Sequence, residues 1–190
     1  MQKMDLRVKK NYKLLMDSLL ILMKEKAFED IKVTDICNLA MVHRTTFYSH
    51  FQDKYQLLEF AIKELQKDLS LKVLSNHNIE NFQEYYIQLI ELFLEHISKH
   101  KNIYLPILDN NHNSITMDIL YHTFIEDVKK HLKEEEKLQI KHKIPIDMIA
   151  EFYSNAVFGI CVWWFKNKEP IPKEKFIQYI QDLISTNTHL

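Results

Sequence analysis

One stretch limits what this chain can fold into more than any other: residues 33–58, which read VTDICNLAMVHRTTFYSHFQDKYQLL. Its first part places apolar residues at the spacing of one face of a short α-helix. These residues are Ile36, Leu39 and Ala40. Residues 41–43 break the pattern and are too few to form a real loop. A second short helix then carries Phe47 and Phe51 on one face, four residues apart. The pattern predicts two short helices joined by a tight turn.

The second helix is polar on the side opposite its phenylalanines, because each helical residue turns by about 100°. The residues on that side and along its edges are Arg44, Thr45, Thr46, Tyr48 and Ser49. Hydroxyl groups and a guanidinium are what proteins use to read base edges and hold phosphates in a major groove. The pattern therefore indicates a helix-turn-helix that binds DNA. It leaves open which of the three aliphatic hydroxyls reaches a base.

The stretch resembles the N-terminal DNA-binding domain of TetR-family (TetR/AcrR) transcriptional regulators. The residues that carry the resemblance are Asp35, Ile36, Cys37, Val42, Arg44, Thr46, Phe47, Tyr48, His50, Phe51, Lys54 and Leu57. It covers the N-terminal third of the chain. It implies an all-α protein of about nine helices, with a three-helix helix-turn-helix domain followed by a C-terminal helical domain for ligand binding and dimerisation.

The resemblance also implies which residues contact DNA. Tyr48 and His50 match the family's phosphate-contacting pair, and Lys54 opens the fourth helix, where backbone N–H groups attract phosphate. The expected set is Thr34, His43, Arg44, Thr45, Thr46, Tyr48, Ser49, His50 and Lys54. The alternatives are a solvated Arg44, a core-packed Tyr48 and a hydrogen-bonded, half-buried His50.

Two positions depart from the family pattern. Ala27 ends the first helix and Met41 stands at the turn, where the family usually has glycine. Glycine adopts positive φ without steric cost, whereas another residue costs on the order of 1 kcal/mol. We expect the packed domain to absorb this cost. Lys32 stands where the family often has threonine, so we expect Thr34 to cap the second helix, with Asp35 in its first turn.

Composition supports an all-α fold. One glycine and four prolines leave little material for strand turns. Cys37 and Cys161 are expected to be small buried residues and not a disulfide or a redox pair. The charged N-terminus is followed by no apolar run of membrane-spanning length, so we expect no signal peptide, no membrane partner and a soluble, cytoplasmic protein.

Charge is distributed unevenly along the chain. Residues 1–75 hold thirteen Lys and Arg against ten Asp and Glu, and residues 76–190 hold twelve against sixteen. A basic head on an acidic body suits DNA binding, although chance would produce the same asymmetry. We expect a DNA-binding domain over residues 1–54, a connecting helix over 55–75 and a regulatory and dimerisation domain over 76–190.

The segment from about residue 146 to 166 is apolar most of the way round, so as a helix it needs cover on two sides. A chain of this length hardly supplies that cover alone. With the final helix, from residue 173 to about 184, the segment resembles the family's dimerisation pair, which forms a four-helix bundle across a two-fold axis. The expected interface residues are Phe152, Ala156, Gly159, Ile160, Trp163, Phe176 and Ile180.

The family's ligand pocket is only weakly marked here. The candidate lining residues are Tyr86, Tyr104, Tyr121, Phe124 and Tyr153, although aromatics at helical spacing are more often core. They favour a small apolar or aromatic effector. His96 and His100 have the i, i+4 spacing of a metal pair, but ten histidines make such a pair common by chance. We expect no metal, no cofactor and no catalytic residues.

These patterns predict a homodimeric, sequence-specific DNA-binding transcriptional regulator. It most simply represses by occupying a pseudo-palindromic operator and is released by a small-molecule effector that binds the C-terminal domain. The alternative is a DNA-binding regulator, or an activator, controlled by a protein partner. An enzyme would need convergent acid–base or metal groups, which the sequence does not offer.

Overall fold

The computed structural model describes residues 6–75, 82–109, 115–137, 139 and 141–187, and within these ranges every regular element is helical. One 3₁₀ turn, Phe28–Asp30, follows the first helix. The α-helices are α1 (Leu6–Glu25), α2 (Val33–Ala40), α3 (Arg44–Tyr48), α4 (Lys54–Leu74), α5 (Phe82–Lys99), α6 (Lys101–Asp109), α7 (Ile115–Lys137), α8 (Ile146–Lys166) and α9 (Lys173–Asn187). The predicted all-α class is confirmed.

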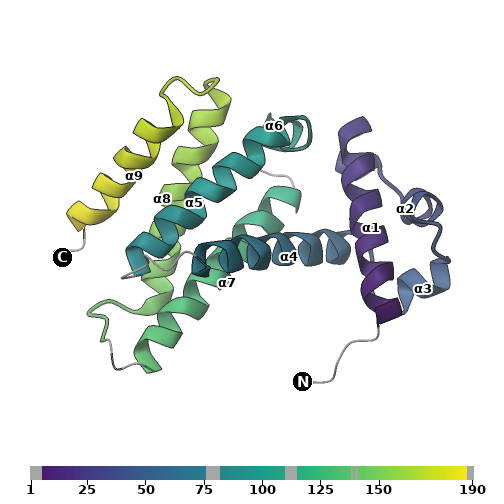
Figure 1. Cartoon of the computed structure of the whole chain (residues 1–190), viewed down its shortest axis with the longest axis horizontal. Coiled ribbons are helices and arrows are strands. Elements are labelled where there is room, and N and C mark those ends of the chain that lie inside the picture. The colour runs from purple at the N-terminus through teal and green to yellow at the C-terminus, as the bar shows by residue number, and fades with distance from the viewer. Residues whose placement is uncertain (1–5, 76–81, 110–114, 138, 140, 188–190) are drawn as a thin grey trace.

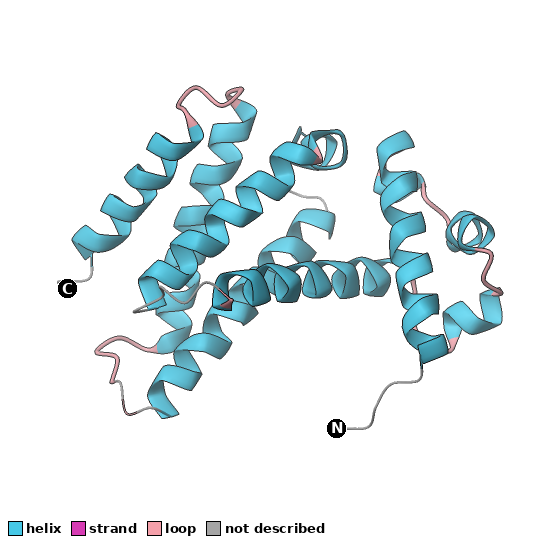
Figure 2. Ribbon diagram, viewed as in Figure 1, coloured by secondary structure: helices cyan, strands magenta, loops and turns pink. Residues whose placement is uncertain are grey.

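Long helix α4 joins two parts of the molecule. In Figure 1 the head, α1 to α3, lies on the right, and α4 runs from it into the body formed by α5 to α9. Helix α4 packs on α1 in the head and on α5 and α7 in the body. Figure 2 shows how short the links are within the head and between α8 and α9. Any change in how the body holds α4 therefore reaches the head directly.

The head core extends into the body. It is built around α1, the 3₁₀ turn, α2, α3 and the first turns of α4, and its largest fully buried side chains include Phe47, Leu15 and Leu19. The same cluster includes Ile103 of α6, and partly buried residues of α7 pack against it. A division at residue 75 is therefore a division along the chain, whereas the packing is continuous.

Several expected boundaries change. Proline usually ends or kinks a helix, yet Pro106 lies inside α6, which continues to Asp109. Pro145 stands just before α8 and not within its first turn. Helix α3 ends at Tyr48, so Phe51 lies beyond it, although Phe51 N still donates to Phe47 O at 2.9 Å. The expected polar breaks at residues 76–78 and 110–114 lie outside the described residues.

Candidate nucleic-acid interface and body cavities

The turn between α2 and α3 is a left-handed helix cap. Met41 has φ 53° and ψ 38°, its N–H donates to Asn38 O at 3.2 Å, and Val42 N donates to Cys37 O at 3.0 Å. Its side chain is 94% exposed, so nothing packs against it to offset the strained backbone. Ala27, by contrast, has φ −57°, so glycine is not required there.

Helix α3 is held by one side chain and presents the others. Phe47 is fully buried, whereas Arg44, Thr45, Tyr48 and Ser49 are exposed. Thr46 is half-buried, and its carbonyl accepts a 2.8 Å hydrogen bond from Ser49 Oγ. His43, the residue before the helix, is exposed. The polar face expected from helical periodicity is therefore present, and its DNA contacts stay predictions.

The N-terminus of α2 differs from expectation. Lys32 is the capping residue, and the Asp35 carboxylate accepts from Lys32 N at 3.1 Å and from Lys26 Nζ at 2.6 Å. The hydrogen bond from Lys26 lowers the pKa of Asp35. Thr34 is half-buried in the first turn and does not cap the helix, so that expectation was wrong. Leu39, expected on the inner face, is 44% exposed, and Cys37 is buried instead.

His50 is held by the first helix. Its Nδ1 lies 3.4 Å from Tyr12 Oη, and the two rings meet edge to face with centroids 5.0 Å apart. Tyr12 also packs against Phe51 and Phe60, so this aromatic cluster joins α1, the end of α3 and α4. The half-buried, hydrogen-bonded imidazole is the alternative that the sequence left open, and only one of its two nitrogens is used by Tyr12.

Lys54 has an internal role. Its ammonium donates to Phe28 O at 2.8 Å and Glu29 O at 2.6 Å and lies 4.8 Å from the centroid of the Phe28 ring. Burial lowers the pKa of Lys54, against the opposing effect of Glu29 and Asp30. The Asp53 carboxylate caps α4 by accepting from Gln56 N, where we expected phosphate. The predicted phosphate contact therefore depends on the third N–H of the ammonium.

Three neighbouring hollows lie among the described helices of the body. The largest, called here the outer pocket, has about 550 Å³ and lies between α5, α7, α8, the end of α9 and residues 141–144. The second, the junction cavity, has about 120 Å³ and is lined by α1, α4, α5, α6, α7 and α8. Between them lies the neck, of about 40 Å³, lined by α4, α5, α7 and α8.

The expected pocket residues are divided between these hollows. Tyr86, Phe124 and Tyr153 line the outer pocket. Tyr104 lines the junction cavity, where its hydroxyl lies 3.0 Å from His96 Nε2. Burial lowers the pKa of His96 to about 4, so this imidazole is neutral at pH 7. Tyr121 lines none of these three hollows, so its place in a pocket stays a prediction.

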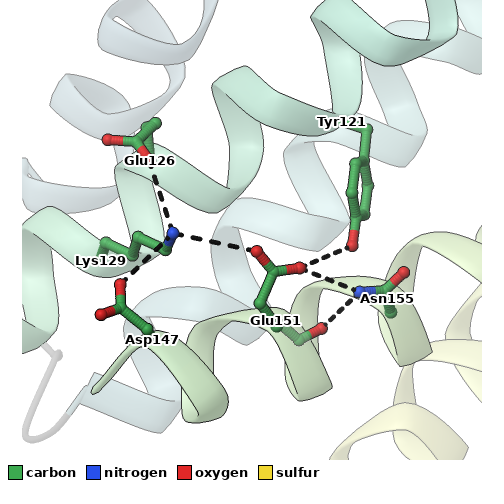
Figure 3. Close-up of polar contacts among 6 residues, drawn as sticks. All are labelled: Tyr121, Glu126, Lys129, Asp147, Glu151 and Asn155. Carbon is green, nitrogen blue, oxygen red and sulfur yellow. Dashed lines mark hydrogen bonds and ion pairs between the residues drawn. The ribbon is translucent and has the colours of Figure 1, made fainter. Parts of the chain in front are cut away.

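Tyr121 belongs instead to a polar seam between α7 and α8, which Figure 3 shows. Its hydroxyl donates to Glu151 Oε2 at 3.2 Å, and Asn155 Nδ2 donates to Glu151 O at 2.7 Å. Lys129 lies within 4 Å of three carboxylates, those of Glu126, Asp147 and Glu151. The seam ties α7 to α8 beside the outer surface of α8.

Comparison with known proteins identifies the chain. The TetR model described as the transcriptional regulator C-terminal region matches residues 80–186, which is more than half of the chain. This chain belongs to the TetR family of transcriptional regulators. Members of the family bind DNA and dimerise, and the head of this TetR-family chain has a helix-turn-helix, as expected for the family.

Two curated relatives are similar to this TetR-family chain over part of their length. The uncharacterised HTH-type transcriptional regulator YxbF of Bacillus subtilis is 19% identical over 175 residues, 89% of this chain and 43% of YxbF. The transposon Tn10 TetC protein of Escherichia coli is 26% identical over 99 residues, 52% of this chain and 50% of TetC. The chain thus spans half or less of the length of these relatives.

Solved structures share the fold along nearly the whole chain. A TetR regulator from Streptococcus agalactiae is 23% identical, with a TM-score of 0.57 and coverage of 94% and 95% of the two chains. FadR of Thermus thermophilus, a TetR-family repressor in complex with lauroyl-CoA, is 15% identical, with a TM-score of 0.62 and coverage of 90% and 92%. FadR of Bacillus subtilis, in complex with stearoyl-CoA, is 14% identical, with a TM-score of 0.60 and coverage of 90% and 96%.

The TetR-family chain presents an apolar stripe on α8. Met148, Phe152 and Trp163 are 63%, 61% and 48% exposed, and Ala156 and Gly159 are exposed between them. Helix α8 has the length and composition to cross a membrane, but its opposite side packs on α7 in the body. The apolar stripe therefore matches the face on which the interface is predicted.

Three expected interface residues do not belong to this stripe. Phe176 and Ile180 are each 2% exposed, and Phe176 stacks on Trp164 with centroids 4.9 Å apart and planes 7° from parallel. They hold α9 on α8 within the protomer, so their assignment to the interface was wrong. Ile160 is half-buried, at the edge of the stripe. Helical spacing placed the apolar residues of α9 on one face but did not indicate which neighbour that face would meet.

Sequence reasoning also missed residues that matter for the hollows. Ser154 is fully buried, lines the outer pocket, and its Oγ has no hydrogen-bond partner in the described part of the chain. Lys141 and Lys143 stand at the same pocket. The available signal for Ser154 was a serine, the only one in α8, at helical spacing from the buried Ala150 and Val157. No signal was available for the lysines, because their position depends on how the α7–α8 link folds.

Proposed function

We propose that this TetR-family regulator binds a pseudo-palindromic operator as a homodimer and represses transcription until a small apolar molecule enters its body. The observation that carries the proposal is the exposed polar face of α3, fixed by the buried Phe47 at its back. A short helix held in this way presents hydroxyls and one guanidinium to a major groove. Two such helices in a dimer would read half-sites about one helical turn apart.

The exposed stripe of α8 supports the dimer. It consists of side chains of the kind that is depleted on free surfaces and enriched in the cores of obligate interfaces. Gly159, the only glycine of the chain, lies on this stripe, and a Cβ placed on it would meet nothing within 4 Å in the protomer. Glycine inside a helix costs roughly 1 kcal/mol relative to alanine, and the protomer offers no reason for it. Close approach of a second α8 supplies one.

The junction cavity supports control by a small molecule. Leu58 and Ile62 of α4 line this cavity and also belong to the head core. A ligand that fills the cavity would therefore contact residues that position the head. It would act only through its greater affinity for the released conformation. The two FadR proteins, which share this fold, were solved in complex with acyl-CoA molecules, whose acyl chains are apolar.

Control by a protein partner is the second candidate, and a partner could also make the protein an activator. Such a regulator would need no internal cavity. The three hollows therefore favour the small-molecule mechanism. A reporter gene placed behind the operator, with and without the regulator, gives the sign of regulation.

The proposal is tested by titrating the purified protein against the DNA upstream of its own gene at two salt concentrations, with random DNA as a control. We expect a footprint of two half-sites and a specific affinity well above that for random DNA at the higher salt. Binding that is weak, salt-sensitive and the same for both DNAs would refute an operator at that site. Sedimentation at micromolar concentration should give a dimer. A monomer would refute the proposed binding of a pseudo-palindromic operator by a homodimer.

A further inference from the structure

The outer pocket, the neck and the junction cavity lie in a row. The outer pocket and the neck share Ile90, Phe124 and Val157. The neck and the junction cavity share six lining residues, among them Phe93 and Cys161. Each hollow thus begins where the previous one ends.

The order of lining residues along α8 gives the direction and length of this row. From the outer pocket inward they run from Ile149 through Ser154 and Val157 to Cys161 and finally Phe165. Along a helix that rises 1.5 Å per residue, Ser154 to Phe165 spans roughly 16 Å. An extended chain advances about 1.2 Å per bond, so this distance matches roughly fourteen carbons.

The two ends of the row differ in chemistry. The junction cavity is mostly apolar and holds no formally charged lining residue, its polar lining residues being His96, Tyr104 and Thr116. Lys141 and Lys143 stand at the outer pocket, each exposed and without an ion-pair partner in the described residues. Glu135 and His142 also line the outer pocket, with Oε2 and Nε2 3.5 Å apart, so two ammonium groups stand there against one carboxylate. The outer end therefore has a positive excess.

Ser154 adds a hydrogen-bonding group inside the outer pocket. Its hydroxyl is fully buried and has no partner among the described residues. A buried hydroxyl without a partner is unfavourable, so an acceptor atom from a ligand would stabilise it. The lysines supply positive potential at the outer pocket, and Ser154 supplies a directed donor within it.

We infer that the three hollows form one channel for a single-tailed anionic amphiphile, with its head group at Ser154 and the two lysines and its tail directed through the neck. The inference rests on the proposed role as an effector-released regulator and adds the class of effector. At about 40 Å³ the neck is too narrow for the tail as it stands, so Phe93, Phe124 and Phe158 must move to admit it. Tail length then controls release, because only a long tail reaches Leu58 and Ile62 of α4 in the junction cavity.

The test uses saturated fatty acids of eight and fourteen carbons below their micellar concentrations, with tetradecanol as the neutral control. Binding to the DNA-free protein is measured by calorimetry, and release from operator DNA by fluorescence anisotropy. Each buried methylene should improve affinity about fourfold, so the longer acid, with six more methylenes, should bind roughly four thousandfold more tightly. The shorter acid, even at saturation, should leave DNA bound, whereas the longer acid should release it. Tetradecanol should bind about two- to fivefold more weakly than the longer acid, the value of exposed ion pairs.

Two substitutions test the two ends. Ser154→Ala should weaken the longer acid about fivefold, the value of one hydrogen bond. Ala61→Leu places extra carbons in the junction cavity, so the longer acid should bind more weakly and no longer release DNA. Lys67→Leu, on the exposed side of the same helix, should behave as the parent protein.

Equal affinities of the two acids, or release by the eight-carbon acid, would overturn the channel. Failure of the fourteen-carbon acid to bind the DNA-free protein would overturn the ligand class. Both results leave the proposed regulator intact if the operator footprint is present. Absence of the footprint with normal binding of the longer acid would instead refute the proposed function and retain the ligand site.

Discussion

Replacing Gly159 with alanine should have opposite effects on the protomer and on the dimer. An added Cβ meets nothing within 4 Å in the protomer, so the substitution creates no clash there. Alanine is favoured over glycine inside a helix by roughly 1 kcal/mol, and the residue lies well inside α8. The intrinsic stability of the protomer should therefore rise by about that amount.

The dimer should respond in the other direction. If two α8 helices approach closely at Gly159, the new methyl group overpacks the contact, which costs typically 1–3 kcal/mol. A loss of 1.4 kcal/mol is a tenfold change in an equilibrium constant, so the dimer dissociation constant should rise about tenfold or more.

Sedimentation velocity over a concentration series measures the dissociation constant, and urea unfolding at two protein concentrations separates protomer stability from dimerisation. Lys67→Ala, an exposed position on α4, serves as the control and should change neither dimerisation nor its concentration dependence. A Gly159→Ala protein that is more stable and dimerises as tightly as the parent would refute close approach at this position.

Three further substitutions test the head. Arg44→Ala should weaken operator binding by roughly 1–3 kcal/mol in a footprint titration, and unchanged binding would remove this guanidinium from the contacts. Lys54→Ala removes two hydrogen bonds to the 3₁₀ turn, so urea unfolding should show a loss of about 1–2 kcal/mol in the free energy of unfolding. The DNA affinity of this variant should also depend less steeply on salt concentration, and a changed sequence preference would contradict a phosphate role. The depressed pKa of Asp35 adds stability that is present above its unfolded value and lost as the pH falls through its folded value. Acid unfolding monitored by circular dichroism should therefore show less loss of stability below about pH 4 in Asp35→Asn than in the parent.

Helical periodicity predicted most of the helices correctly, because each helix has its own row of apolar residues along one face. Both predicted ends of α8, at about residues 146 and 166, match the structure. Pro106 lies inside α6 because proline costs only one backbone hydrogen bond, and packing of α6 on α8 and α1 outweighs that local loss. The expectation that Met41 occupies the turn where the family usually has glycine is confirmed, because Met41 adopts the left-handed conformation with positive φ. The short link between α2 and α3 leaves no other way to reverse the chain.

The partners of each side chain were much less predictable than its face. Periodicity placed Phe176 and Trp164 on apolar faces, but their mutual stacking depends on how α8 and α9 are positioned by the link between them. Lys54 was expected to reach outward, yet the carbonyls of a turn 25 residues earlier lie within reach of its ammonium. Such contacts arise only after distant segments have packed, so no local pattern encodes them.

The junction cavity explains how a small ligand can supply enough free energy for release. An unfilled cavity costs about 24 cal/mol per Å³, so about 120 Å³ corresponds to roughly 3 kcal/mol that the empty protein forgoes. A tail that fills it in the released conformation, and not in the DNA-bound one, regains that energy differentially. This difference shifts a two-state equilibrium by about a hundredfold. Leu58 and Ile62 line the cavity and also pack in the head core. The shift in the conformational equilibrium therefore acts directly on α4, the helix that positions α3, and does not require a longer chain of contacts.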